Sequence, residues 1–329
     1  MRDRLAVWPQ YLVPQQALTR FAGVVARWQG GAASGALIRW FIRRYNVRMA
    51  EAAEPRPGAY ASFNDFFTRA LRPGARPLAA AHLLSPVDGA ISQFGRIQRG
   101  QIFQAKGHQY SAAALLGGDL GGDPKSANAL AAPFEDGRFA ALYLSPRDYH
   151  RIHMPCAGTL RRMVHVPGAL FSVNPTTARG VPGLFARNER VVCLFDDAQG
   201  QPFALVLVGA TIVGSMATVW HGVVNPPRPG VVRDWRYGGA DGAAPVTLAQ
   251  GAEMGRFLLG STVVMLFPKP ATGAWAFNPG WAPGGAIRMG EMMGESMRES
   301  TGESTGESMG ESTGDSTGDS TADKIVGPH

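Results

Sequence analysis

The chain has 329 residues, 45% of them hydrophobic, which suits one large domain or two small ones built around an apolar core. Lys and Arg number 32 against 25 Asp and Glu, a net charge of +7, and there are only two cysteines, Cys156 and Cys193. This composition excludes a disulfide-stapled scaffold and favours a reducing compartment. No apolar run reaches about 18 residues, and the opening "MRDRLAVWPQ" is too short in its apolar part for a secretory signal.

The charge is unevenly distributed along the chain. Residues 1–50 hold eight arginines and one acid, Asp3, whereas residues 286–329 hold nine acids and three bases. A basic end of this kind suits an anionic partner, either nucleic acid or lipid head groups.

Residues 1–50 are predicted to form two amphipathic helices. The first carries an apolar stripe at helical spacing and the second repeats the pattern after "QGGAASG", with stripes Leu18, Phe21, Ala22, Val25 and Leu37, Ile38, Phe41, Ile42, Tyr45. Arg20 and Arg27 lie off the first stripe, and Arg39, Arg43, Arg44 and Arg48 dominate the rest of the second helix. Such helices can lie in a membrane interface, although periodicity alone is explained as simply by ordinary packed helices with a solvated basic side.

Residues 51–285 are predicted to be rich in β-strands. Short apolar runs with branched residues occur at 138–144, 190–196, 203–216 and 261–267, and Gly and Pro punctuate the segments between them. Helices followed by a largely antiparallel β core define an α+β fold. Residues 286–329, with their near-repeat of "GEST", lack apolar residues to bury and are predicted to be a disordered low-complexity tail.

The stretch "YLSPRDYHRIHMPCAG" (143–158) contains two histidines, His150 and His153. Ser145 as a cap, followed by a proline, predicts a short helical turn, on which the two histidines would share a face. Either histidine can serve as a general base near neutral pH. The spacing H-x2-H-x2-C, ending at Cys156, also permits a metal-binding reading, but it lacks a fourth ligand and matches no common zinc pattern, so no metal is expected.

Two further stretches contribute reactive groups. In "LLSPVDGAISQFG" (83–95), Asp88 is either a simple turn residue or a carboxylate that orients a histidine and stabilises its cation. In "LLGSTVVMLFP" (258–268), Gly260-Ser261 stands at the start of an apolar run. A serine needs a base to become a nucleophile, and a preceding glycine leaves the carbonyl sterically open. Asp88, one of the two histidines and Ser261 are of the right types to form a catalytic triad.

These stretches together resemble the phosphatidylserine decarboxylase family, of the pyruvoyl-dependent bacterial type. "LGST" at 259–262 resembles the self-cleavage motif of that family, and "SPVDG" at 85–89 and "YHRIHMP" at 149–155 resemble its aspartate and histidine motifs. Further similar segments follow in the same order, and the resemblance covers about residues 5–285: "FNDFFTRALRPGARP", "FSVNP", "LFARNERVV" and "VGATIVGS".

The resemblance implies a proenzyme that cuts itself between Gly260 and Ser261. His153, with Asp88, would take the proton of the Ser261 hydroxyl, whose oxygen attacks the Gly260 carbonyl. The products would be a β chain, 1–260, and an α chain, 261–329, whose first residue becomes a pyruvoyl group. That group would form a Schiff base with the serine amine of phosphatidylserine and accept the electrons left when CO2 departs. His150 would assist decarboxylation or protonation.

The same resemblance implies where the protein works and with what. Phosphatidylserine is anionic and stays in the bilayer, so residues 1–50 would dock the enzyme on an anionic membrane surface. A peripheral protein on the cytoplasmic face of the cell membrane is therefore expected, and the family likeness favours αβ units assembled in pairs. A nucleic-acid partner is not expected, because the arginines lie on otherwise apolar helices without a reading motif.

Two other functions compete with this interpretation. A Ser-His-Asp hydrolase acting on external substrates would stay in one piece and would usually carry a G-x-S-x-G elbow, which "LLGST" is not. A non-enzymatic membrane-binding protein would explain the basic N-terminus, but it gives no reason for the aspartate, histidine and Gly-Ser stretches to occur together.

Overall fold

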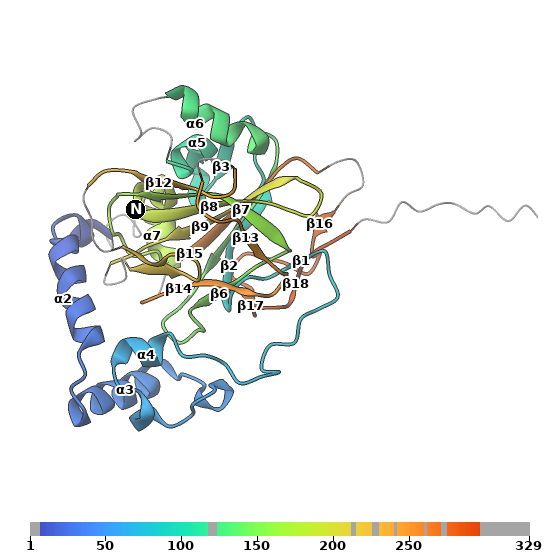
Figure 1. Ribbon diagram of the computed structural model, residues 1–329. Helices are drawn as coiled ribbons and strands as arrows, with labels where there is room; N and C mark the ends of the chain where they lie inside the picture. Colours follow the sequence, from blue (N-terminus) through green and yellow to red (C-terminus); the bar gives the residue numbers. More distant parts are fainter. Residues whose placement is uncertain are drawn as a thin grey trace, which may run out of the picture. The chain divides into compact units, whose positions relative to one another are not determined.

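The computed structural model describes residues 7–117, 124–211, 215–225, 230–239, 242–259, 262–270 and 275–296. Helical segments dominate the first part of the chain, as Figure 1 shows. They are η1 (Trp8–Tyr11), α2 (Gln15–Arg27), α3 (Ala32–Tyr45), η2 (Met49–Glu51), η3 (Pro57–Ala59) and α4 (Phe63–Phe67). The later helices are short: η4 (Ala105–Gly107), α5 (Ala112–Leu115), α6 (Pro124–Ala131), η6 (Ala132–Phe134), α7 (Pro175–Gly180) and α8 (Leu184–Arg187).

The largest sheet of the described residues has nine antiparallel strands. Eight run in the order β12-β7-β8-β9-β15-β5-β2-β17, and β13 also pairs with β7. Their bounds are β2 (Gly89–Arg96), β5 (Arg138–Tyr143), β7 (Gly158–Val166), β8 (Arg190–Asp196), β9 (Pro202–Val208), β12 (Arg233–Arg236), β13 (Val246–Leu248), β15 (Thr262–Phe267) and β17 (Ala286–Ile287).

Within the described part of the chain, three smaller sheets accompany the nine-stranded one. A four-stranded sheet has the order β11-β10-β14-β6, a three-stranded sheet has the order β1-β18-β16, and β3 pairs with β4 alone. Their bounds are β1 (Leu83–Leu84), β3 (Gln101–Phe103), β4 (Gln109–Ser111), β6 (Arg151–His153), β10 (Met216–Thr218), β11 (Gly222–Asn225), β14 (Glu253–Phe257), β16 (Ala276–Phe277) and β18 (Met292–Glu295). The expected α+β class, with helices first and an antiparallel core after them, is confirmed.

Strand β15 is the centre of this architecture. It pairs along its whole length with β5 on one side and from Thr262 to Leu266 with β9 on the other, and all six of its residues are buried. Its run "TVVMLF" is apolar on both faces because the sheet separates two apolar clusters. Val264 and Leu266 belong to one cluster, while Val263 and Met265 belong to the other.

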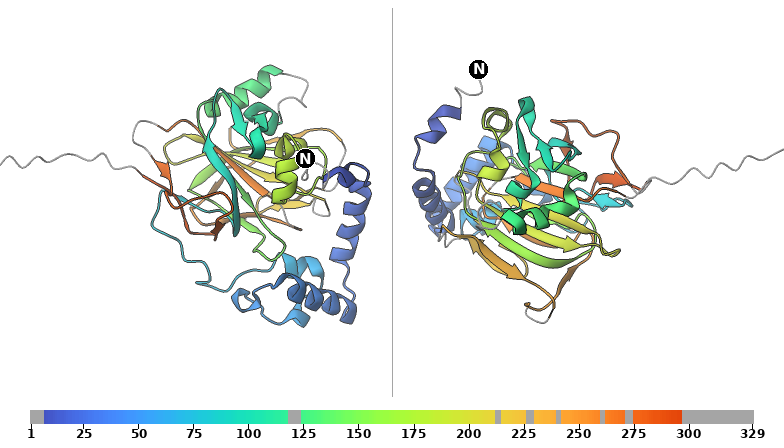
Figure 2. Two further views of the ribbon diagram at one scale, coloured as in Figure 1. Left: turned by 180° about the vertical axis from the view of Figure 1, so that it is seen from behind. Right: turned by 90° about the horizontal axis from the view of Figure 1, so that it is seen from above.

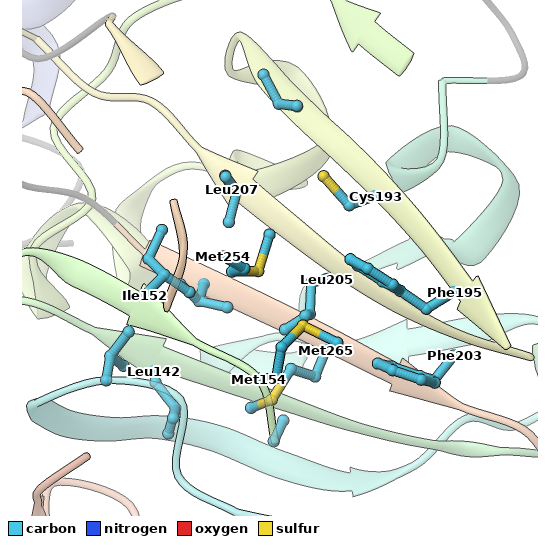
Figure 3. Close-up of a cluster of buried hydrophobic side chains, with 14 of the residues drawn as sticks. Leu142, Ile152, Met154, Cys193, Phe195, Phe203, Leu205, Leu207, Met254 and Met265 are labelled. Atoms are coloured by element: carbon cyan, nitrogen blue, oxygen red, sulfur yellow. The ribbon is translucent and has the colours of Figure 1, made fainter. Parts of the chain in front are cut away.

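The second cluster joins the two larger sheets. Figure 3 shows Ile152, Met154 and Met254, from β6 and β14 and their ends, facing side chains of the large sheet such as Leu205 and Met265. Strand β6 and the start of β15 therefore belong to one packed core.

The N-terminal helices form a third apolar cluster of their own. Views from several sides place α2, α3 and α4 beside the sheets (Figure 2). Ile38 of α3 packs there with Phe63, Phe66 and Phe67 of α4. The apolar side chains of α2 are different. Leu18 and Phe21 of the predicted stripe are 37% and 68% exposed, and Val24, which lies off that stripe, is 62% exposed.

The folded part of the chain extends beyond residue 286, where the sequence predicted a tail to begin. Strands β17 and β18 pair with β2 and β1, and their segment buries three apolar side chains, Ile287, Met289 and Met293. The acidic near-repeat does not include these residues, because its first "GES" begins at Gly294. The predicted boundary at 286 was therefore wrong. The repeat from 298 onward lies outside the described residues.

Two truncations test this boundary. A chain ending at Met297 should keep the melting temperature of the full chain, because it retains every described strand. A chain ending at Gly285 loses three buried apolar residues, each stabilising the fold by about 1.5–3 kcal/mol. That sum is comparable to the stability of a whole domain, so we expect insoluble or unfolded protein. Calorimetry and soluble yield measure both, and equal melting temperatures would place the end of the fold before β17.

Candidate active site

The predicted cleavage point, Gly260-Ser261, lies outside the described residues, but both of its neighbours are described. Thr262 begins β15 and is fully buried between Tyr143 of β5 and Val208 of β9. Leu259 is partly buried and packs against both the first apolar cluster and the helical cluster. The bond predicted to break therefore belongs to the connection that enters the central strand.

The histidine stretch lies beside the chain that leads to this connection. Strand β6 pairs with β14, which ends at Phe257, and the Phe257 amide donates a hydrogen bond of 3.0 Å to the carbonyl of His150. The sequence predicted a helical turn here. Ser145 and Asp148 instead close a tight turn, with the Asp148 carboxylate accepting from the Ser145 amide at 2.7 Å, and the chain then extends into β6. The helical turn was wrong because pairing with β14 holds this segment extended.

His153 is held as a neutral base. Its Nδ1 lies 2.8 Å from the Gly251 carbonyl, which can only accept, so Nδ1 carries the proton. Nε2 then has the lone pair and lies 3.1 Å from the hydroxyl of Tyr149, which donates to it. Burial lowers the pKa of His153, and the Gly251 carbonyl opposes that shift. A neutral imidazole with its lone pair on Nε2 is the form that accepts a proton from a serine.

The Asp88 motif is hydrogen-bonded to the His153 motif through the backbone, but the Asp88 carboxylate accepts its hydrogen bonds from other groups. The Pro86 carbonyl accepts from the His153 amide at 2.9 Å, which brings the two motifs together. The Asp88 carboxylate accepts from Arg76 Nε at 2.8 Å, from Arg76 Nη2 at 2.5 Å and from the Met289 amide at 2.9 Å. No hydrogen bond between Asp88 and His153 is present among the described residues.

The orienting role expected for Asp88 is therefore filled by the Gly251 carbonyl. Asp88 acts on His153 through its charge, which favours the protonated imidazole and so opposes the lowering of the His153 pKa by burial. Arg76 shares its guanidinium between Asp88 and Glu51, whose carboxylate lies 2.7 Å away. Both carboxylates hold the pKa of Arg76 above its usual range.

His150 has a different environment from His153. Its side chain is fully buried, its ring centroid lies 4.0 Å from that of Phe67, and its Nδ1 lies 2.8 Å from the Asp148 carbonyl. Nδ1 therefore donates, and the lone pair is on Nε2, which has no hydrogen-bond partner among the described residues. Burial lowers the pKa of His150 to about 3. His150 is thus a neutral, unpartnered acceptor at physiological pH.

Sequence reasoning missed two residues of this site. Arg76 gave no signal beyond its place in "RPGARP", because its contact with Asp88 spans 12 positions and depends on the path of the loop before β1. Tyr149 stands next to His150 in the sequence, and burial raises the pKa of its hydroxyl to about 12, so it remains a donor. A pair of histidines that follow a tyrosine was the available clue.

Gly89 follows Asp88 at the start of β2, where the backbone of β2 lies very close to that of β5. A Cβ atom at this position would collide with the backbone carbonyl of Tyr143. Only glycine therefore lets β2 approach β5 closely enough to keep Asp88 in its place.

The buried histidines predict a pH-dependent stability. The folded pKa of His150, about 3, lies below its unfolded value of 6.5, so the unfolded state binds the proton first as pH falls. Stability should thus decrease below about pH 6.5, by up to about 1.4 kcal/mol per pH unit for this group. We expect His150→Gln, in a Ser261→Ala background that keeps one chain, to lose about 2 kcal/mol less than its parent between pH 7.5 and 5.

Urea unfolding at the two pH values measures this difference. His82→Gln is the matched control, because His82 is exposed and should leave the pH dependence as it is in the parent. An unchanged loss in the His150→Gln variant would show that His150 is not held neutral in the folded state.

The chain is similar to known proteins over most of its length. The family model described as phosphatidylserine decarboxylase matches residues 63–295, and a second one, described as PSD, matches residues 5–46. The phosphatidylserine decarboxylase proenzyme of Albidiferax ferrireducens is 69% identical over 291 residues, 88% of this chain and 97% of that protein. Proteins of the same name from an Azoarcus species and from Dechloromonas aromatica are 67% and 65% identical, over 88% and 89% of this chain and 96% and 98% of theirs. The chain belongs to the phosphatidylserine decarboxylase family.

Proposed function

We propose that this chain is a self-processing enzyme that decarboxylates phosphatidylserine to phosphatidylethanolamine, with its cofactor made from its own Ser261. The observation that carries the proposal is the state of the two family-motif histidines. Both are neutral and both have the lone pair on Nε2. His150 directly precedes β6 and His153 ends it, and β6 pairs with β14, which is the last strand before the predicted cut. A serine nucleophile needs such a base. Neither rival function gains support from the structure or the comparisons.

In the proposed cut, His153 Nε2 accepts the proton of the Ser261 hydroxyl. For that to happen the Tyr149 hydroxyl must release Nε2 or pass the proton on, because it occupies that lone pair in the precursor. The Asp88 charge then stabilises the imidazolium, while Arg76 keeps that carboxylate in position. The serine oxygen replaces the peptide nitrogen on the Gly260 carbonyl, which leaves the two parts joined by an ester. Loss of the Cα proton of residue 261 and breakage of its Cβ–O bond then release the β chain 1–260 with a carboxylate end. The dehydroalanine left at the start of the α chain 261–329 takes up water and loses ammonia, which gives the pyruvoyl group.

The described residues on either side of the predicted cut suit a small polar carbonyl group at residue 261. Two buried polar atoms, His150 Nε2 and Thr262 Oγ1, lack hydrogen-bond partners among the described residues. The Thr262 hydroxyl can donate to a carbonyl, whereas His150 Nε2 is an acceptor that can take up a proton. A pyruvoyl carbonyl there would supply the electron sink that decarboxylation of an amino acid requires. Around it, His150 would hold or move a proton at Nε2. The packed walls of Phe67 and Leu259 would exclude water.

Denaturing gels with intact mass test the cut. The wild-type protein should run as two pieces divided between Gly260 and Ser261, with the smaller one blocked at its N-terminus. Ser261→Ala should stay in one piece and be inactive, because it lacks the nucleophile. His153→Ala should cut at least about 100-fold more slowly, the usual contribution of a general base. The control is His82→Gln, an exposed histidine that should leave the cutting rate as it is. Processing of His153→Ala at the wild-type rate would remove His153 from this role.

We also propose that the N-terminal helices dock the enzyme on an anionic membrane at the cytoplasmic face. Large apolar side chains are exposed along η1 and α2 and their ends: Trp8, Tyr11, Leu12, Val13, Leu18, Phe21, Val24 and Trp28. Arg20 and Arg27 are exposed on the same helix. No helix of the described residues is long and apolar enough to cross a bilayer. An exposed apolar stripe flanked by arginines supports an interfacial location instead.

A cavity of about 570 Å³ adjoins this surface, lined by residues of η1 and α2 and by the loop 168–171. Tyr11, Val13, Leu170 and Phe171 give it apolar walls, and Arg20 is the cation among its lining residues. This composition suits part of an anionic lipid. Assembly of αβ units in pairs stays a prediction.

Vesicle sedimentation tests membrane docking. We expect Phe21→Ser with Val24→Ser to weaken binding to phosphatidylserine-containing vesicles at least tenfold, because two exposed apolar side chains no longer enter the interface. Binding of the wild type should fall with added salt. The matched control is Val231→Ser, a 59% exposed valine of the β core. Equal binding of the helix variant and the control would show that α2 does not face the lipid.

A further inference from the structure

Arg69, two residues after α4, is a buried cation whose donors are poorly satisfied. The residue is 5% exposed. Its Nη1 and Nη2 lie 3.5 Å from the carbonyls of Phe66 and Arg147, at the outer limit of a hydrogen bond. Its Nε is buried and has no hydrogen-bond partner among the described residues. A guanidinium has five N–H donors, so this one keeps most of its capacity.

Two other buried guanidinium groups show how such a group is normally satisfied. Arg190 donates to three backbone carbonyls at 2.5–2.9 Å, and Arg76 donates to two carboxylates at 2.5–2.8 Å. The carboxylates whose charges act on Arg69 are those of Asp88 and Glu51, which already bind Arg76. Arg69 therefore carries a positive charge that its surroundings do not neutralise with a hydrogen-bonded partner, and burial lowers its pKa accordingly.

This charge lies next to the reaction centre proposed above. The Arg69 guanidinium lies 5.2 Å from the ring of Phe66, and the following residue of α4, Phe67, packs its ring 4.0 Å from that of His150. Arg69 in turn disfavours protonation of His150 through its charge. Leu259, the last described residue before the predicted cut, packs against the same phenylalanine cluster.

We propose that Arg69 binds the phosphodiester of the lipid substrate and makes the site specific for a phosphate-bearing serine. This assignment rests on the function proposed above. A guanidinium matches the geometry of two phosphate oxygens with parallel hydrogen bonds, and the low polarity around Phe66 and Phe67 strengthens each of them. Phosphate would complete the donors that the protein leaves unsatisfied.

The phosphate, and not the carboxylate, is the group that Arg69 should hold. A cation paired with the carboxylate would stabilise the charge that must disappear as CO2 leaves, and would thus favour the ground state over the transition state. The phosphate keeps its charge throughout the reaction. Binding there fixes the substrate at no cost to the chemical step.

Isothermal titration of the processed protein with two soluble probes separates these possibilities. Glycerophosphoethanolamine carries the phosphate without a carboxylate, and O-methyl-L-serine carries the carboxylate without a phosphate. We expect Arg69→Met to raise the Kd for glycerophosphoethanolamine about 10- to 100-fold and to leave that for O-methyl-L-serine within about twofold. Arg69→Lys, which keeps the charge but not the fork, should give a smaller loss and serves if Arg69→Met does not fold.

Self-cleavage on a gel reports whether each variant is folded, and Arg147→Gln is the control, because the side chain of Arg147 is 66% exposed. A weaker affinity for O-methyl-L-serine alone would assign Arg69 to the carboxylate. If the Kd values of both probes rise equally, or neither changes, Arg69 is a structural residue after α4. Each of these results overturns the proposal. A wild-type chain that is never cut would refute the proposed function itself, which is a separate outcome.

Discussion

The pairing of β15 with β5 and β9 is the constraint on which the rest of this structure depends. The strand is apolar on both faces and hydrogen-bonded on both edges, so its first residue, Thr262, has a fixed position between Tyr143 and Val208. The connection that reaches it from β14 is held at both ends: Leu259 packs against two apolar clusters, and Thr262 pairs with Val208 of β9. A bond that must be attacked by its own chain benefits from such fixed neighbours, because orientation removes much of the barrier to an intramolecular reaction.

Around that strand, backbone carbonyls and arginines determine the state of the reactive side chains. The carbonyls of Gly251 and Asp148 each hold a proton on Nδ1 of a histidine, and burial keeps both imidazoles neutral. Arg76 holds Asp88 as an electrostatic partner rather than a hydrogen-bonded one. The site therefore separates three tasks: backbone carbonyls orient the histidines, a carboxylate provides charge, and an arginine fixes that carboxylate.

Much of the fold was predictable from local pattern, because the apolar runs at 138–144, 190–196 and 261–267 match β5, β8 and β15 within one residue. The run 203–216 was predicted as one segment, but β9 ends at Val208 and β10 begins at Met216. Patterns that depend on distant partners were not predictable. The stretch before His153 had good helix-capping residues, yet pairing with β14 made it extended. Likewise, no residue near Asp88 in the sequence indicates that Arg76 will bind it. The exposure of Phe21 on α2 was not predictable either, because it depends on which side chains of the rest of the fold pack against that helix.

The interleaving of strands from both sides of residue 260 has a consequence for folding. Strands β15, β17 and β18, which follow the proposed cut, pair with β5, β9, β2 and β1, which precede it. The uncut precursor assembles these pairs within one molecule, at a rate independent of its concentration. Once the backbone is broken, reassembly after denaturation becomes a bimolecular reaction between two fragments, neither of which holds the complete nine-stranded sheet. The mature protein would then stay folded because it unfolds slowly, so its stability would be kinetic and set by the unfolding rate rather than by an equilibrium free energy.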